Sequence, residues 1–380
     1  MIPPWSALPW GPPAAPVRRG QRGVALTLAV FALAVLGALA GASLLLAGHE
    51  RLLGRNVLRQ AQAFSVAEAA AQGVVLDPAS QYLEMALGGQ AATSGLGPGG
   101  RFEQTVTRVG PEIFLATAHG FSPDGAARQR IGFLFALQRL PVAFRAALTI
   151  QGNLRVGGES AVHGSDQLPP DSAGCGPLQD VPGVYGPDPD SIDVSACSGA
   201  PCVSGSPPFM TDSTRAGPDI SGEAGPLDSL RSWVTKTVLG GDLRIEPSVV
   251  ALSCNAADPA NWGDPLPGAG PCGRYFPVVW IEGDATLHGL RGQGVLLVNG
   301  NLGLRGAFLF HGAVLVAGAL TSDGTGGQVV GAVTVLGQDS SWSALLGAGG
   351  IAYSSCAVSR SLSSSARLRP LTSRGWLDLY

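Results

Sequence analysis

Charged residues are scarce in this sequence. Only 13% of its 380 residues are charged, lysine occurs once, at Lys236, and the formal net charge is -3. A surface that binds nucleic acid carries a stripe of basic side chains, and no such stripe occurs outside the flanks of one apolar run near the N-terminus. The composition therefore predicts no nucleic-acid partner.

Sequence fingerprints of catalysis are also missing. No nucleophile elbow of the G-x-S-x-G type, P-loop or dinucleotide-binding motif stands between a strand and a helix. A β-helix enzyme that cleaves polysaccharides would need converging carboxylates. The available acids, which form no recurring pair, are Glu282, Asp284, Asp323 and Asp339. We therefore predict a non-catalytic protein without a cofactor.

Patterns of metal ligands are weak. Asp188, Asp190 and Asp193 lie close together, but they lack the spacing and terminal glutamate of an EF-hand loop, which favours solvated loop carboxylates. Three histidines each precede a glycine, and stacked segments could align them in a ladder. They are His163, His288 and His311. Because no ligand pair has helical or turn spacing, contacts with backbone groups are the favoured interpretation, and no metal site is predicted.

The six cysteines include no C-x-x-C pair. They are Cys175, Cys197, Cys202, Cys254, Cys272 and Cys356. A zinc site usually needs closely spaced cysteine pairs, whereas an even number of cysteines on one side of a membrane is typical of disulfides in an oxidising compartment. We predict disulfides, with their connectivity left open, and an extracytoplasmic location for the bulk of the chain.

One long hydrophobic run, residues 24–47, contains no charge. At about 1.5 Å per residue it can cross a bilayer core of roughly 30 Å, and it is longer than the core of a cleaved secretory signal. Arg18, Arg19 and Arg22 favour a cytoplasmic N-terminus, although further arginines follow the run. We predict a single-pass protein of the inner (cytoplasmic) membrane, with residues 1–23 as a leader that is cleaved or disordered.

Periodic apolar residues extend the predicted helix over residues 24–76. Its second half offers an apolar stripe to the next folded unit. Gly37 and Gly41 form a G-x-x-x-G pair, which marks a close helix contact or reflects the tolerance of membrane helices for small residues. Residues 88–100 are rich in glycine and predict a flexible connection.

Three β-like runs follow, and turn residues separate them. They cover residues 102–109, 112–121 and 127–137. The intervening Gly-Pro and Ser-Pro-Asp-Gly segments are typical of tight turns between antiparallel strands. We predict a small antiparallel sheet within residues 77–145, whose apolar face covers the helix stripe.

A second pattern recurs at a spacing of roughly 17–18 residues. Similar short segments begin at Gly283, Gly300 and Gly318, and a related one begins at Gly152. This spacing matches one coil of a β-solenoid, in which glycine serves the corners. We predict a solenoid over residues 146–360, with the early segment stacked on the later ones.

A cysteine-bearing, loop-rich insertion is predicted at about residues 166–274. Its one predicted helix is Asp228–Leu239, with Asp228 as the N-cap, and disulfides are expected to hold its shape. Residues 361–380 are predicted as a C-terminal tail. The predicted fold class is α+β: a long N-terminal helix, a small antiparallel sheet, and a β-solenoid with this insertion.

Residues 18–76 carry a particular order of features. Gln21-Arg22-Gly23 ends a basic leader, the apolar run follows, and an Ala-Glu-Ala motif lies within residues 64–73. In this order the segment resembles the PilX-type minor pilins of type IV pilus systems. The resemblance implies cleavage after Gly23 by a prepilin peptidase, which makes Val24 the new N-terminus, and insertion of the helix into a pilus or pseudopilus.

The chain departs from major pilins at Leu28. Major pilins carry a glutamate at this fifth mature position, and that glutamate pairs with the N-terminus of a neighbouring subunit. The resemblance therefore implies a tip or priming subunit in pilus assembly, with the membrane, other pilins and minor pilins as partners. The alternative is a static membrane-anchored β-helix scaffold or adhesion protein of the cell envelope, which assembles through its sheet edges.

Overall fold

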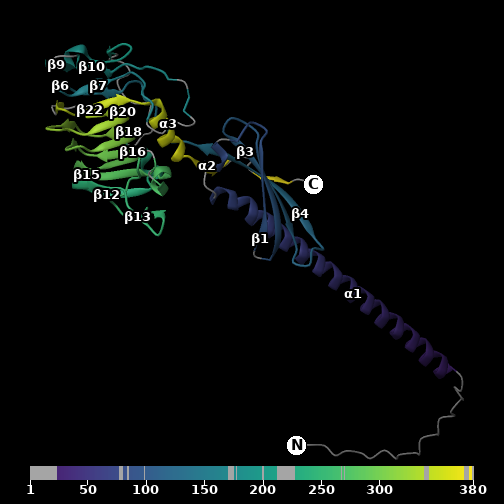
Figure 1. Cartoon of the computed structure of the whole chain (residues 1–380). Helices are drawn as coiled ribbons and strands as arrows, with labels where there is room; N and C mark the ends of the chain where they lie inside the picture. The colour runs from purple at the N-terminus through teal and green to yellow at the C-terminus, as the bar shows by residue number, and fades with distance from the viewer. Residues whose placement is uncertain are drawn as a thin grey trace, which may run out of the picture.

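The computed structural model divides the chain into three parts. In Figure 1 a long helix leads to an antiparallel sheet packed on its C-terminal part, and a curled, mostly parallel sheet lies beyond. The predicted leader, residues 1–23, lies outside the described residues. The structure describes residues 24–76, 80–83, 85–97, 99–169, 175–176, 178–198, 201–211, 227–266, 268, 270–337, 342–371 and 376–378.

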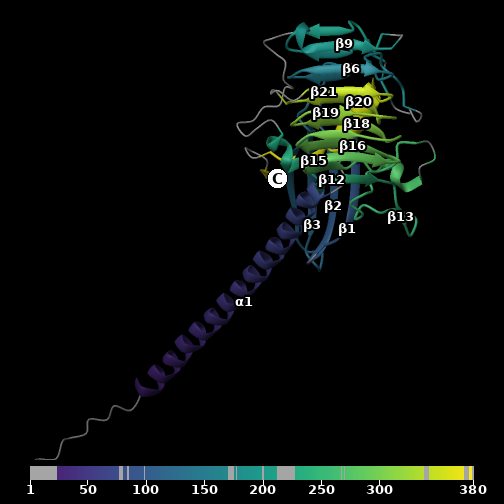
Figure 2. The same ribbon diagram turned by 90° about the vertical axis from the view of Figure 1, so that its left-hand side faces the viewer.

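Helix α1 (Val24–Gly73) is continuous over 50 residues, and its bounds agree with the helix predicted from the sequence. A 3-10 turn, η1 (Val74–Leu76), and a short helix, α2 (Ser80–Leu83), follow it. At about 75 Å in length, α1 projects far beyond both sheets (Figure 2). The residues that it buries are small and lie three or four positions apart. They are Ala63, Val66, Ala67, Ala70 and Ala71.

The first sheet is antiparallel. Its strands pair in the order β1-β2-β3-β4-β23, and β24 also pairs with β4. The strands are β1 (Gln90–Gly97), β2 (Gly100–Arg108), β3 (Ile113–Phe121), β4 (Arg128–Gln138), β23 (Arg367–Pro370) and β24 (Trp376–Asp378). Strands β2, β3 and β4 occupy the three runs in which the sequence predicts strands.

Two parts of this sheet differ from the sequence-based expectation. The prediction that residues 88–100 form a flexible connection is wrong, because β1 pairs with β2 along its whole length. Small residues suit this strand: a Cβ atom at Gly95 would stand 2.9 Å from the ring of Phe102. The predicted C-terminal tail, residues 361–380, supplies β23 and β24, which both pair with β4.

Helix α1 and the first sheet approach each other closely at Gly120 of β3. A Cβ atom there would stand 2.1 Å from the carbonyl oxygen of Ala63 and 2.5 Å from the amide nitrogen of Ala67. Deeper in the same core, the rings of Phe114 and Phe135 stack with their centroids 5.4 Å apart. The sheet therefore needs a small helix face at one end and fills the other end with aromatic rings.

The second sheet is curled, and its pairings among the described residues are parallel. Its earlier strands are β5 (Leu148–Ile150), β6 (Leu154–Gly158), β7 (Ala161–His163), β8 (Val184–Gly186), β9 (Ile192–Cys197), β10 (Val203–Ser204) and β11 (Phe209–Thr211). Its later strands are β12 (Lys236–Ile245), β15 (Val278–Gly289), β16 (Arg291–Asn299), β17 (Leu302–Leu304), β18 (Leu309–Val316), β19 (Leu320–Ser322), β20 (Gln328–Val335), β21 (Ser343–Gly347) and β22 (Gly350–Tyr353).

Other elements surround this sheet. A short antiparallel hairpin, β13 (Val249–Val250) and β14 (Ser253–Cys254), projects near β12 (Figure 1). Helix α3 (Ser355–Ser364) connects the last strand of the curled sheet to β23. The 3-10 turns are η2 (Pro189–Ser191), η3 (Asp228–Trp233) and η4 (Gly270–Arg274).

Neighbouring strands of the curled sheet pair at the spacing of the sequence repeat. Val278 of β15 pairs with Val295 of β16, 17 positions later, and Leu302 of β17 pairs with Leu320 of β19, 18 positions later. Strand β15 pairs with β16 along its first part and with β17 along its second part. The sheet therefore curls back on itself, while a complete solenoid stays a prediction.

Strands far apart in the sequence complete the sheet. Leu154 of β6 pairs with Ser343 of β21, so the segment that begins at Gly152 stacks on the later repeats, as the sequence predicts. The predicted insertion, residues 166–274, supplies strands to both ends of the sheet. Strands β8 to β11 extend it beyond β5 to β7, and β12 pairs with β15 at the opposite end.

The helix predicted at Asp228–Leu239 is wrong in its second half. The 3-10 turn η3 ends at Trp233, its N-cap is Leu227 rather than Asp228, and no side chain caps it. From Lys236 the chain forms β12, which pairs with β15. Threonine and valine are β-branched and suit a strand with a neighbouring edge to pair with, so tertiary pairing overrides the helical pattern.

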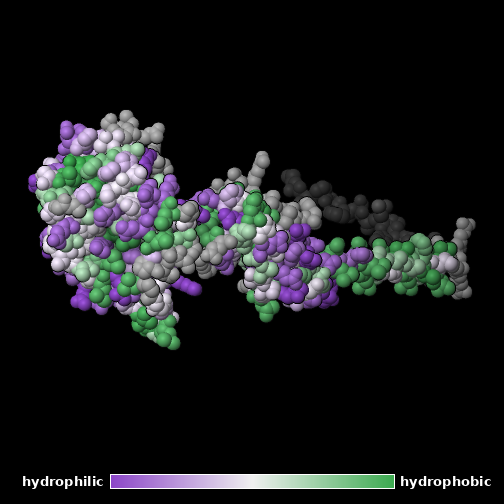
Figure 3. All heavy atoms as spheres, turned by 45° about the horizontal axis from the view of Figure 1, so that its top comes forward, coloured by the Kyte–Doolittle hydropathy of each residue, from purple (hydrophilic) through white to green (hydrophobic). Residues whose placement is uncertain are grey.

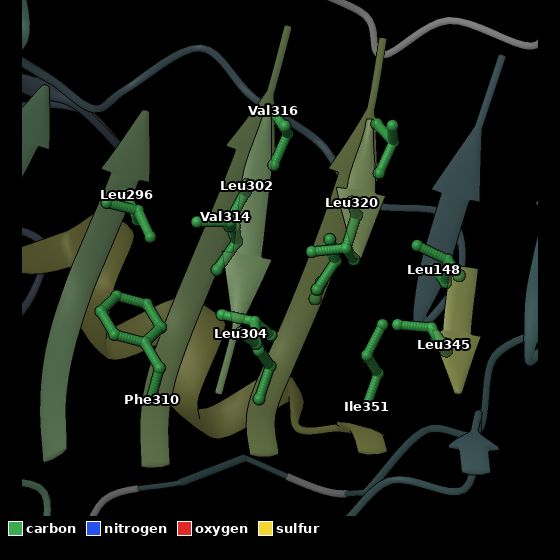
Figure 4. Packing of buried hydrophobic residues seen from close by; sticks show 14 of the residues in the cluster. Leu148, Leu296, Leu302, Leu304, Phe310, Val314, Val316, Leu320, Leu345 and Ile351 are labelled. Carbon is green, nitrogen blue, oxygen red and sulfur yellow. The ribbon is translucent and has the colours of Figure 1, made fainter. Parts of the chain in front are cut away.

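The interior of the curled sheet is aliphatic. Figure 4 shows Leu296 and Val314 on strands of one face close to Leu302 and Leu304 of the opposite face. A second apolar layer, which includes the indole of Trp280, covers the outer side of β15, β16 and β18. This second layer also takes in the segment that follows β4, so it joins the two sheets.

Candidate functional site

The N-terminal half of α1 is exposed and apolar (Figure 3). Its exposed large side chains before Ala47 are Val24, Leu26, Leu28, Val30, Phe31, Leu33, Val35, Leu36, Leu39, Leu44, Leu45 and Leu46. Within the part of the chain that the structure describes, this helix alone is long and apolar enough to cross a membrane, with a mean hydropathy of 2.4 in its most apolar window. Its length and composition suggest a single-pass membrane anchor.

The residues predicted for processing and helix contact lie on this half. Val24 begins α1, whereas Gly23 lies outside the described residues. A Cβ atom added to Gly37 or Gly41 would meet nothing within 4 Å. The described part of the chain therefore leaves the G-x-x-x-G surface open to a partner. Cleavage between Gly23 and Val24 and a helix contact at Gly37 and Gly41 stay predictions.

Polar contacts fix the first sheet on α1 beyond the apolar half. The guanidinium of Arg59 lies 2.7 Å from the carboxylate of Asp124, in the turn between β3 and β4. Hydrogen bonds from the Ser122 hydroxyl and the Ala126 amide, together with Arg59, lower the pKa of the Asp124 carboxyl. The turn therefore keeps a charged acceptor for Arg59 well into the acidic range.

All six cysteines, which are predicted to form disulfides, are paired. The bonds are Cys175–Cys356, Cys197–Cys202 and Cys254–Cys272. The first ties the loop after β7 to helix α3, the second closes the connection between β9 and β10, and the third holds the β13–β14 hairpin against η4. Each disulfide therefore holds in place a loop or hairpin that the strand pairing of the curled sheet does not hold.

Two acids considered for catalysis make hydrogen bonds at one corner of the curled sheet. Glu282 accepts from the indole nitrogen of Trp280 at 2.6 Å and from the amide of Asn299 at 3.2 Å, and these bonds lower the pKa of its carboxyl. Asp284 accepts from the backbone amide of Asn301 at 2.7 Å, and Asn301 accepts from the amide of Ala319 at 2.8 Å. These bonds link one repeat to the next.

Sequence reasoning missed this role, although a signal for it was present. Asp284 and Asn301 follow the repeated glycines Gly283 and Gly300, so a side chain with an acceptor recurs at the same position of neighbouring repeats. Such an acceptor can take the amide hydrogen of the next repeat. Of the remaining acids, Asp323 lies 3.5 Å from Arg305, and Asp339 lies outside the described residues.

Asp188 and Asp193, two of the three neighbouring aspartates, use their carboxylates in contacts within the protein. Asp188 caps η2 by accepting from the amide of Asp190, and Asp193 pairs with Arg155 at 2.9 Å. Hydrogen bonds from Ser195 lower the pKa of the Asp193 carboxyl. The carboxylate of Asp188 therefore serves the turn, and that of Asp193 also joins β9 to the neighbouring strand β6. Among the described residues, no group of three or more His, Cys, Asp or Glu side chains is arranged to hold a metal ion.

The three histidines do not form a ladder. His163 lies 2.8 Å from the hydroxyl of Ser204 and His288 lies 3.0 Å from the carboxylate of Asp242, so side chains replace the expected backbone groups. His311 is buried, and burial followed by the charge of Arg360 lowers its pKa to about 4. Strands β20 and β22 separate the strand of His311 from that of His163.

Comparisons with known proteins add little to this description. No protein-family model matches the chain, and no curated protein matches it. Among solved structures it is similar to the competence-associated pilin ComZ from Thermus thermophilus, with 13% identity over 83% of this chain and 96% of that chain, and a TM-score of 0.23. A TM-score this low means that the two chains do not superpose as whole folds, so nothing about this chain is inferred from that pilin.

Proposed function

We propose that this chain is a non-catalytic minor subunit of a type IV pilus or pseudopilus, held in the inner membrane by α1 before assembly. The observation that carries the proposal is the division of α1. One unbroken helix of 50 residues is exposed and apolar in its first half and packs on an antiparallel sheet near its end. Such a helix can leave lipid for a bundle of like helices at little hydrophobic cost, because one apolar environment replaces another.

The proposed function includes removal of the leader in front of the apolar half of α1. A prepilin peptidase removes the leader between Gly23 and Val24, and the arginines Arg18, Arg19 and Arg22 keep that leader in the cytoplasm. The absence of a side chain on Gly23 lets the backbone enter the peptidase cleft. In the filament, the small surface at Gly37 and Gly41 lies against the helix of a neighbouring pilin.

The position in the filament is proposed to be the tip. Leu28 supplies no carboxylate for the N-terminus of an earlier subunit, which suits a subunit that primes the filament and has no such neighbour. The curled sheet is proposed to be a β-solenoid, supported by pairings 17 and 18 positions apart. This sheet lies outside the bundle of helices at the centre of the filament, and it presents a surface to other minor pilins or to an adhesion target.

N-terminal sequencing of the membrane-extracted protein tests the processing step. We expect a mature chain that begins at Val24, and an intact leader in a Gly23→Leu variant. A Gly20→Leu variant is the matched control, because it adds the same side chain to the leader away from the cleaved bond. An intact leader in the unaltered chain would favour the static membrane-anchored scaffold instead.

Immunogold labelling of sheared filaments tests the tip position. We expect label at one end of each filament and at no point along the shaft. The same preparation from the Gly23→Leu strain should carry no label, because an uncleaved subunit stays in the membrane. Label spread evenly along the shaft would contradict a tip role while leaving the pilin role intact.

A further inference from the structure

The β13–β14 hairpin presents an apolar tip to solvent. Val249 and Val250 of β13 are 50% and 60% exposed, and Leu252, in the turn, is 93% exposed. Figure 3 shows this hairpin as a hydrophobic projection from the curled sheet. Exposed apolar side chains gathered on one projection are typical of a surface that meets another molecule. We call residues 249–252 the apolar finger.

The backbone of the turn in the finger is strained. Ala251 and Leu252 have φ angles of 49° and 63°, in the left-handed region that favours glycine. Glycine, asparagine or aspartate would form a two-residue hairpin turn with less strain. The chain instead places a leucine there, although its side chain gains almost no packing in the free subunit. Backbone strain of this kind is typical of sites at which a side chain takes part in recognition.

The base of the hairpin holds the finger in place. The disulfide Cys254–Cys272 joins β14 to η4, and Cys272 is buried. The side-chain amide of Asn261, which is also buried, donates to the carbonyl oxygens of Ser248 and Asn255, one before β13 and one after β14. The finger therefore projects in a fixed direction, so little conformational entropy is lost when it binds.

The apolar finger lies at the end of the curled sheet that faces the N-terminal side of the molecule. In Figures 1 and 2 the hairpin lies at the lower end of that sheet, below β12, and α1 runs downward toward the N-terminus in both views. The finger therefore faces the direction in which α1 enters the membrane in the proposed function. In both views it is nearer to the C-terminal end of α1 than to the apolar half, so lipid around that half does not cover it.

The size of the finger limits what can bind it. A stable interface between separate proteins buries roughly 800 Å² on each partner, from about 20–30 residues a side. The tip of one hairpin cannot supply that area to a free protein or to a second copy docked through the same hairpin. The finger therefore suits a partner that other contacts already hold beside this chain, because a small apolar contact then adds greatly to binding. In the proposed function that partner is a pilin subunit whose helix packs beside α1.

We propose that the apolar finger inserts into an apolar groove on the neighbouring pilin subunit, on the membrane side of this chain in the filament. The proposal rests on the proposed function, because subunits that join after a priming subunit come from the membrane and meet its membrane-facing surfaces. Val250 and Leu252 lose their contact with water in that groove. The burial of these side chains offsets the strain that the turn carries in the free subunit.

Photo-crosslinking in cells identifies what binds the finger. A benzophenone side chain replaces Leu252 in one strain and Leu346, an exposed leucine of β21, in another. Strands β15, β17 and β19 separate β21 from β12, so Leu346 is a control on the same sheet. We expect position 252 to crosslink to another pilin subunit with its own long apolar N-terminal helix, and position 346 not to reach that subunit. A crosslink from position 252 to a second copy of this chain, to a protein without such a helix, or to none would overturn the proposal.

One substitution separates docking from folding. Leu252→Gly removes the leucine together with the backbone strain, so the hairpin should be no less stable than in the unaltered chain. We nevertheless expect about tenfold fewer sheared filaments with immunogold label at one end, because a few apolar side chains supply most of the energy of a small contact. Leu346→Ser, which removes an exposed leucine of the same sheet, should keep the label. Equal labelling in the two variants would contradict a docking role for the finger.

Processing and labelling of the unaltered chain keep the two proposals apart. If the unaltered chain begins at Val24 and labels filament ends, while Leu252→Gly labels them equally, the filament role stands and the proposal for the finger is wrong. If the unaltered chain keeps its leader and labels no filament, the proposed function fails together with the finger.

Discussion

The two sheets of this protein both depend on glycine, but in different ways. In the first sheet one residue, Gly120, lets a helix lie against a strand, and α1 has solvent on its other side. In the curled sheet, glycines stack in a column from strand to strand. The column consists of Gly294, Gly312 and Gly331 on β16, β18 and β20.

The glycine column tolerates an added side chain less well than Gly120 does. The atoms that the side chain would meet belong to the backbone of a strand that is paired on both sides. A Cβ atom at Gly331 would stand 1.8 Å from the carbonyl oxygen of Gly312, and one at Gly312 would stand 2.0 Å from that of Gly294. Both residues also have positive φ angles, 150° and 139°. A helix can shift away from a single contact, whereas a strand in the middle of a sheet cannot move without breaking its pairings.

The largest expected effect is therefore at Gly331. We expect Gly331→Ala to lower the free energy of unfolding of the curled sheet by about 4 kcal/mol, through backbone strain together with overpacking. Denaturant unfolding of the detergent-solubilised chain measures this. Gly186→Ala is the control, because its Cβ atom would meet side chains only at an ordinary 3.4 Å. Equal losses in the two variants would show that the column has no special role.

Acid should destabilise the curled sheet through His311. Its pKa in the folded chain is lowered to about 4, so below about pH 6.5 the unfolded chain binds the proton first. Stability should fall by about 3 kcal/mol between pH 7 and pH 4 and level off below that. Unfolding curves across this range, compared with those of a His311→Gln variant, measure the contribution. An identical pH dependence in both proteins would contradict it.

A smaller loss is expected at Gly120. Alanine there displaces α1 from β3, and we expect a cost of about 2 kcal/mol, since the helix can move outward. Limited proteolysis and hydrogen exchange should detect loosening near Ala63 and Ala67, with the curled sheet unchanged. Gly110→Ala is the matched control, because its Cβ atom would lie 3.4 Å from Ile113. Faster exchange in the curled sheet of Gly120→Ala would contradict the prediction, because it would show that strain in the first sheet also destabilises the second.

The smallest effect is a gain of stability in the β13–β14 hairpin. Leu252 has a φ angle of 63° and its side chain is 93% exposed, so it loses little packing when replaced. We expect Leu252→Gly to stabilise the hairpin by about 1 kcal/mol, because glycine adopts this backbone conformation without a Cβ clash. Local hydrogen exchange near Ser253 is the measurement, and faster exchange in the variant would be the opposite of the expected result.

The local patterns of the sequence predicted the elements that local chemistry controls. The apolar run and its periodic continuation gave α1, and turn residues between β-rich runs gave β2, β3 and β4. The repeat near Gly283 and Gly300 predicted strands that pair at its own spacing, because identical corners stack best when each strand meets the next repeat. These features depend on side chains only a few positions apart, or on one period.

Tertiary contacts decided the elements whose patterns are weak or ambiguous. Residues 90–97 have little strand propensity, yet the open edge of β2 makes them a strand, and the edge of β15 does the same for the segment after Trp233. The disulfide partners of the six cysteines depend on which loops meet in space. Arg101 and Arg128, 27 positions apart, likewise meet at the ring of Phe121 only because of the strand register. The sequence by itself determined α1 and the repeat, because the periodicity of a helix or a repeat depends on residues close together in the chain. The tertiary structure decided which distant strands and cysteines pair, because the stability of a paired strand edge or a disulfide depends on both partners.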